Sequence, residues 1–139
     1  MKTLFLSLMA AVVLFSACQS NNNSTAANAG GAGANGPQMK FEKETHDFGK
    51  IRPGDTVSFD FRFTNTGALP LIITDGYASC GCTKPTWPKT PVKPGEAGVI
   101  HVTFDSKGKM GLQDKLITIT ANTNPAQNHV HLIGEVAPK

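Results

Sequence analysis

The stretch Val57-Ser58-Phe59-Asp60-Phe61-Arg62-Phe63-Thr64 decides the fold. Apolar side chains alternate with polar or charged ones along the whole run. A β-strand directs successive side chains to opposite faces, so this alternation is the signature of a strand with one buried and one wet face. We therefore predict that the valine and the phenylalanines enter a core, while the polar residues face water.

The same period of two, or a short β-branched run, recurs on both sides of this stretch. The predicted strands cover residues 39–48, 55–65, 69–77, 83–87, 97–105, 111–122 and 128–137. Pro53-Gly54 and Pro94-Gly95 precede two of them in matching contexts, where proline presets the first turn residue and glycine accepts a positive φ. Short strands between such turns, without helical periodicity, predict an all-β fold: a single immunoglobulin-like β-sandwich of about seven strands over residues 39–137.

The start of the chain indicates export. Lys2 is followed by an uncharged apolar run over residues 4–15, which is too short to span a bilayer, so residues 1–17 are predicted to be a signal peptide. Phe15-Ser16-Ala17-Cys18 resembles the lipobox of bacterial lipoproteins. The resemblance implies cleavage before Cys18 and acylation of that cysteine, palmitate included, which would anchor the chain in a membrane. The alternative is an ordinary signal peptide followed by an unmodified cysteine.

Residues 18–38 are predicted to be the lipidated cysteine and a flexible linker. From residue 19 to residue 38 the linker holds no charge and no aromatic side chain, so it cannot bury enough surface to offset its ordering entropy. Gln19 after the cysteine resembles the sorting pattern for the outer membrane. The expected location is the bacterial cell envelope, with the domain lipid-anchored at the outer membrane and facing the periplasm.

Charge argues against a nucleic-acid partner. The formal net charge is +3, and no basic stripe with interleaved aromatic residues is visible. Catalysis is also not expected, because no His, Asp or Glu lies within four residues of Cys80 or Cys82 to act as a base beside a thiol.

Three short motifs resemble one bacterial family. They are Phe48-Gly49-Lys50-Ile51, Phe63-Thr64-Asn65-Thr66-Gly67 and Ser79-Cys80-Gly81-Cys82-Thr83. Together they resemble domain of unknown function 1573, which is related to immunoglobulin-like domains of the ASPM/SPD-2/Hydin type. The resemblance implies the sandwich but no established activity. Asn65 is interpreted as structural, because its side chain can hold a turn by bonding its own backbone.

Cys80-Gly81-Cys82 is the feature that could carry chemistry, and three interpretations stay open. The pair could form a tight disulfide across Gly81, which would serve as a staple or as a redox couple. The thiolates could bind Cu(I), or form half of a zinc site. Both side chains could also be partly buried and inert. The additional metal ligands considered are His129 and His131, which share one strand face, and also His46, His101, Met39 and Met110.

The leading functional hypothesis is a membrane-anchored envelope lipoprotein with a non-catalytic interaction or scaffolding domain and no cofactor. Its partner would be an unidentified envelope protein. The alternatives are a copper-binding protein that uses Cys80 and Cys82, and a thiol-disulfide factor. Trp87, in a proline-rich stretch, is predicted to pack a long loop onto the sandwich.

Overall fold

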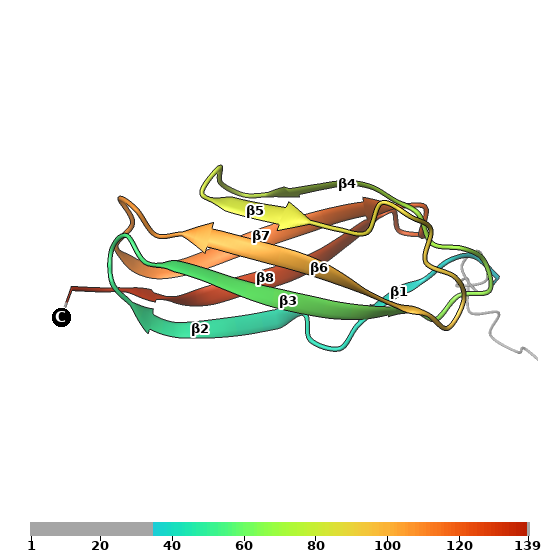
Figure 1. Ribbon diagram of the computed structural model, residues 1–139, viewed down its shortest axis with the longest axis horizontal. Coiled ribbons are helices and arrows are strands. Elements are labelled where there is room, and N and C mark those ends of the chain that lie inside the picture. Colours follow the sequence, from blue (N-terminus) through green and yellow to red (C-terminus); the bar gives the residue numbers. More distant parts are fainter. Residues whose placement is uncertain (1–34, 139) are drawn as a thin grey trace, which may run out of the picture.

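The computed structural model describes residues 35–138, which form two four-stranded β-sheets packed face to face (Figure 1). The predicted signal peptide, Cys18 and the linker up to residue 34 lie outside the described residues. The strands are β1 (Met39–Phe41), β2 (Thr45–Ile51), β3 (Thr56–Asn65), β4 (Ile73–Ala78), β5 (Thr83–Thr86), β6 (Ala97–Asp105), β7 (Gly111–Ala121) and β8 (Gln127–Val136).

One sheet has the order β1-β3-β6-β5 and the other β2-β8-β7-β4. Only β2 and β8 pair in parallel among these strands. The prediction of an all-β sandwich is confirmed, with eight strands where about seven were predicted. The difference lies in the predicted strand 39–48, which is divided at residues 42–44. These are the exposed, charged residues Glu42, Lys43 and Glu44, and there the chain crosses from one sheet to the other.

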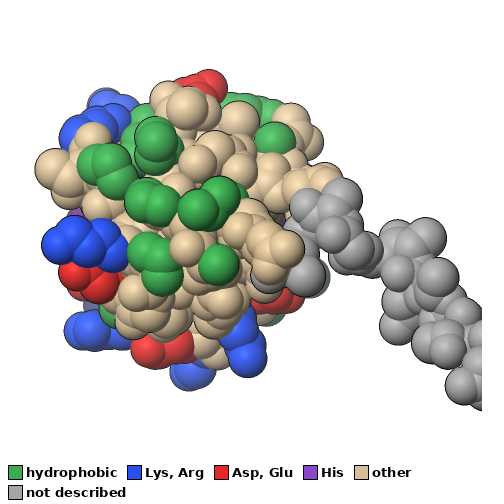
Figure 2. Space-filling view, turned by 90° about the vertical axis from the view of Figure 1, so that its right-hand side faces the viewer, with side chains coloured by type: hydrophobic (Ala, Val, Ile, Leu, Met, Phe, Trp, Pro, Cys, Tyr) green, Lys and Arg blue, Asp and Glu red, His purple; other side chains and the backbone are tan. Residues whose placement is uncertain are grey.

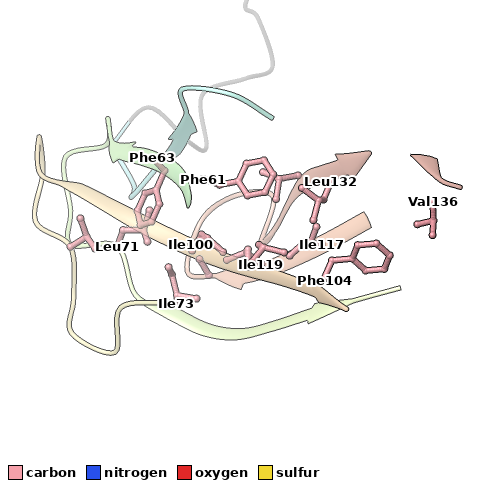
Figure 3. Close-up of a cluster of buried hydrophobic side chains, with 14 residues drawn as sticks. Phe61, Phe63, Leu71, Ile73, Ile100, Phe104, Ile117, Ile119, Leu132 and Val136 are labelled. Atoms are coloured by element: carbon pink, nitrogen blue, oxygen red, sulfur yellow. The ribbon is translucent and has the colours of Figure 1, made fainter. Parts of the chain in front are cut away.

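The core is formed by the apolar side chains of the alternating pattern, which all point to the same side of their strand. Phe61 and Phe63 on β3 are fully buried, and the side chains opposite them come from the second sheet, such as Ile117 and Leu132 (Figure 3). The fourteen buried apolar residues are Phe61, Phe63, Leu71, Ile73, Val92, Ile100, Val102, Phe104, Ile117, Ile119, Ala121, Val130, Leu132 and Val136. The hydrophobic effect of burying this set holds the two sheets together.

Both predicted Pro-Gly turns form, and they are built alike. Gly54 and Gly95 have φ values of 92° and 79°, which glycine tolerates without steric cost. In each turn a backbone N–H reaches back three residues to a carbonyl: Asp55 N donates to Arg52 O at 3.1 Å, and Glu96 N donates to Lys93 O at 3.0 Å. The repeated sequence context therefore gives a repeated structure.

The two ends of the sandwich differ. The described chain begins beside the β3–β4 and β7–β8 connections, whereas the β4–β5 and β6–β7 connections lie at the opposite end (Figure 1). Figure 2 looks onto the first of these ends and shows hydrophobic side chains gathered on it. Leu69 and Ile72, in the β3–β4 connection, are 54% and 44% exposed. Residues 35–138 contain no helix that could cross a membrane.

Candidate functional site

Cys80 and Cys82 lie in the connection between β4 and β5 and form a disulfide. Their Cα atoms are 5.2 Å apart, within the usual range for a disulfide. The buried Thr83 hydroxyl lies 3.5 Å from Cys80 Sγ, and the Cys82 carbonyl accepts a hydrogen bond of 2.9 Å from Asp105 N on β6. Cys82 also packs against the core, so the loop is tied down on its inner side while Gly81 stays exposed.

The histidines considered as metal ligands each have a different neighbour. His129 Nδ1 lies 3.2 Å from Thr118 Oγ1, and His131 Nδ1 lies 2.8 Å from Asp114 Oδ1. Among residues 35–138, no three His, Cys, Asp or Glu side chains come together as a group that could hold a metal ion. Metal binding by Cys80 and Cys82 therefore stays a hypothesis that first requires reduction of the disulfide, because the thiolate is the metal ligand.

Replacing both Cys80 and Cys82 with serine is expected to lower the free energy of unfolding by at most about 2 kcal/mol, because closing so short a loop removes little chain entropy from the unfolded state. Urea unfolding of the variant, compared with the wild-type chain with and without reductant, measures this. A loss well above that figure, or a wild-type chain that takes up two alkyl groups before reduction, would contradict the disulfide staple.

A row of polar side chains crosses the outer face of the β1-β3-β6-β5 sheet. Asp60 Oδ1 lies 2.6 Å from His101 Nδ1, and His101 Nε2 lies 3.3 Å from Thr103 Oγ1. Thr103 Oγ1 lies 3.1 Å from Ser58 Oγ. Carboxylate, imidazole and hydroxyl in this order occur in hydrolase triads.

This polar row stands on an open sheet face, with the Asp60 and His101 side chains 54% and 49% exposed. A hydrolase instead encloses the row and adds donors for an oxyanion. We therefore assign these residues to cross-strand pairing of β3 with β6, where Asp60 faces His101 and Ser58 faces Thr103. No local pattern predicts this row, because it depends on the register of β3 with β6.

His46 on β2 packs against β3 of the other sheet. Its ring stacks on Phe59, with centroids 3.6 Å apart and an angle of 6° between the planes. Burial lowers the pKa of His46 below its ordinary 6.5, nearby Lys43 lowers it further, and Asp47 opposes the shift. The neutral ring is therefore the form that the fold favours.

This shift of the His46 pKa predicts a pH dependence of stability. Because the folded chain holds the proton less tightly than the unfolded chain, the contribution of His46 is present above about pH 6.5 and is lost as pH falls below it. His46→Phe keeps a stacking ring but cannot titrate. Its urea midpoint should fall less than that of the wild-type chain between about pH 7.5 and about pH 5. Equal falls in the two chains would contradict this assignment.

Trp87 packs the long loop as predicted. Its ring lies over Gly76 on β4, where an added Cβ would come within 2.7 Å of the ring. The Lys89 ammonium stands 3.5 Å above the ring centroid, in the geometry of a cation–π contact. The loop after β5 is thus fastened to the edge of the neighbouring sheet, and Trp87 is a packing residue.

The two packed sheets and their strand order define the class of protein: an immunoglobulin-like β-sandwich domain. The chain belongs to the protein family of unknown function DUF1573, whose profile matches residues 39–136. No curated protein matches the sequence.

Solved structures share the fold at low sequence identity. A protein of unknown function from Porphyromonas gingivalis W83 is 19% identical with a TM-score of 0.64, over 75% of this chain and 49% of that one. The ASH/PapD-like domain 7 of human CEP192 is 10% identical with a TM-score of 0.56, over 73% of this chain and 86% of that one.

The VesB protease of Vibrio cholerae is 17% identical with a TM-score of 0.57, over 71% of this chain and 32% of that one. The chain thus spans about half the length of the Porphyromonas protein and a third of the protease. At these identities the comparisons show the fold alone.

Proposed function

We propose that the protein is an envelope lipoprotein whose immunoglobulin-like domain is a non-catalytic interaction module. The observation that carries the interaction role is the open flank of the sandwich. The chain leaves β1 after Phe41, crosses at residues 42–44 and joins the other sheet as β2. Among residues 35–138, no strand therefore pairs with β3 on that side beyond the bond from Glu42 N to Arg62 O. An unpaired strand edge is a template for another chain.

The proposed membrane anchor is supported by the sequence before residue 35 and by the place on the sandwich where the described chain begins. The lipobox-like residues before Cys18 and the uncharged linker precede residue 35 in the chain. The described chain enters at the end that carries the exposed Leu69 and Ile72 (Figure 2). A membrane anchor at Cys18 would therefore leave the flank and the opposite end accessible from the periplasm, with the linker giving reach.

Cys18→Ala in the full chain tests the anchor. The wild-type chain is expected in the membrane fraction of the expressing bacterium, because the lipid chains supply the binding energy. The variant is expected either in the soluble fraction or as a longer chain that keeps its signal peptide. Mass spectrometry of the purified wild-type chain should find Cys18 as the first residue with an added acyl mass. An unmodified Cys18 in a membrane-bound chain would contradict the anchor.

Cross-linking in intact cells separates the interaction role from the cysteine alternatives. An interaction module predicts the same cross-linked partner with wild-type chain and with the Cys80→Ser/Cys82→Ser variant, since neither sulfur lies on the open flank. Loss of the partner in a variant that stays folded would favour the thiol-disulfide factor, for which the disulfide in a partly exposed loop is the supporting observation. Recovery of the chain with bound copper would favour the metal-binding alternative.

A further inference from the structure

Thr83 has a buried hydroxyl whose neighbours are sulfur atoms. The residue is 4% exposed. Its Oγ1 lies 3.5 Å from Cys80 Sγ and 3.9 Å from Cys82 Sγ, and these sulfurs are the hydrogen-bond partners of that hydroxyl within residues 35–138. A disulfide sulfur is a weak acceptor, whereas a charged thiolate accepts strongly. The Thr83 hydroxyl therefore stabilises a thiolate better than it stabilises the disulfide.

Backbone hydrogen bonds hold the two cysteines together independently of the disulfide. Thr83 N donates to Cys80 O at 3.2 Å, which closes a tight turn that contains Cys82. Asp105 N on β6 donates to Cys82 O at 2.9 Å and fixes the turn to the neighbouring strand. The cysteines are separated by two positions, and closing so short a loop adds little stability. The loop can therefore keep its place when the disulfide is reduced.

Both cysteines line hollows at the surface. Cys82 lines one of about 480 Å³ and Cys80 one of about 500 Å³, volumes that suit a small molecule. Lys84 lines both hollows, and the other titratable residues that line them are Asp105 and Lys107 beside Cys82 and Tyr77 beside Cys80. The β4–β5 connection lies at the end of the sandwich opposite the one where the described chain begins (Figure 1). A small thiol can therefore reach the disulfide from solvent.

We propose that Cys80 and Cys82 form a reversible redox site for a low-molecular-weight thiol, in which the Thr83 hydroxyl donates to the released thiolate. The incoming thiolate attacks Cys82 Sγ and forms a mixed disulfide. The bond to Cys80 breaks, and its electron pair goes to Cys80 Sγ, which then takes a proton from water. A second thiolate attacks the small-molecule sulfur of the mixed disulfide and releases Cys82. Two thiols are thereby oxidised to one disulfide, and the protein pair gains two electrons and two protons.

The position of the Thr83 hydroxyl sets the order of these steps. The hydroxyl lies nearer to Cys80 than to Cys82, and a stabilised thiolate is the better leaving group, so the attack falls on Cys82. The exchange is stoichiometric and gives the thiol-disulfide alternative a defined site. It goes beyond the proposed interaction role and does not depend on the open flank, so the failure of either proposal leaves the other standing.

Reaction of the full chain with glutathione tests the proposal. Cys18→Ala leaves Cys80 and Cys82 as the only cysteines. Intact mass and peptide mapping after acid quenching should find a glutathione adduct on Cys82, then the dithiol. The chain should stay folded by circular dichroism, and oxidised glutathione should restore the disulfide. A disulfide that excess glutathione leaves intact would overturn the proposal, because structural disulfides resist this reductant. Unfolding on reduction, or an adduct on Cys80 instead, would also overturn it.

Variants of Thr83 separate its hydroxyl from its packing. Thr83→Val keeps the shape without the hydroxyl and should slow reduction by glutathione at least about fivefold, whereas Thr83→Ser should stay within about twofold of the wild-type rate. Thr118→Val is the matched control, because Thr118 is also 4% exposed but its hydroxyl lies 3.2 Å from His129 Nδ1. This control should not change the rate. Equal rates for Thr83→Val and the wild-type chain would overturn the role of the hydroxyl.

Single-cysteine chains cover the case in which Thr83→Val does not fold. Cys82→Ser leaves the Cys80 thiol beside Thr83, and Cys80→Ser leaves the Cys82 thiol. The pH profile of alkylation gives the pKa of each thiol, whatever its accessibility. The pKa of Cys80 should be lower than that of Cys82, because a hydrogen bond to the thiolate favours the charged form. Equal pKa values, or the reverse order, would overturn the proposal.

Discussion

Replacing Asn65 with alanine is expected to lower the free energy of unfolding by about 3–5 kcal/mol. The Asn65 side chain is fully buried and makes four hydrogen bonds to backbone groups. Its Oδ1 accepts from Gln38 N at 3.2 Å and from Gly67 N at 3.0 Å. Its Nδ2 donates to Leu69 O at 2.8 Å and to Val92 O at 2.9 Å. Alanine removes all four of these hydrogen bonds, and the cost is high because the Asn65 side chain is fully buried.

Urea unfolding of Asn65→Ala, with Asn122→Ala as the control, measures the effect. Asn122 also bridges backbone groups, accepting from Ile72 N at 2.8 Å and donating to Pro70 O at 3.1 Å, but it is exposed and water can take its place. The control should cost about 1 kcal/mol or less. Equal losses in the two variants would mean that Asn65 does not hold the loops together.

Phe61→Ala is the second large effect, with an expected loss of about 3–5 kcal/mol. The Phe61 side chain is fully buried at the centre of β3, where it meets the opposite sheet (Figure 3). Its ring lies edge-on to that of Phe59, with the two centroids 4.9 Å apart. Truncation removes the ring from the core and leaves a cavity that the rigid sheets cannot fill.

Thermal and urea unfolding give the size of the Phe61→Ala effect, and Leu112→Ala serves as the control. Leu112 is 87% exposed, so its truncation should change stability by no more than about 0.5 kcal/mol. A Phe61→Ala chain that keeps the stability of the control would contradict the assignment of Phe61 to the core.

The strands were predictable because their pattern is local. Alternation from Val57 to Thr64 places the phenylalanines inward, and the Pro-Gly dipeptides predict the turns at Gly54 and Gly95. The division of the first predicted strand was missed, because crossing between sheets depends on how β1 and β2 pair with distant strands. Residues 42–44 are the local signal of this division. Three successive charged residues cannot place every second side chain in an apolar core.

The candidate sites were less predictable because they depend on register. The turn bond from Asn65 to Gly67 was predicted, but the bonds to Gln38 and Val92 join segments 27 positions away. Asp60 and His101 are 41 positions apart, and only the β3–β6 register brings them together. The open edge at Ser58 likewise arises from the end of β1. For Cys80 and Cys82 the spacing alone left disulfide, metal and inert interpretations open.

Photo-cross-linking in intact cells tests the interaction role most directly. A photoreactive residue would replace Lys43, on the open flank, or Lys84, on the far strand of the same sheet, in the full membrane-anchored chain. The account predicts one discrete protein adduct from position 43 and none from position 84. A folded, anchored chain that forms no adduct from position 43, or the same adduct from both positions, would contradict it.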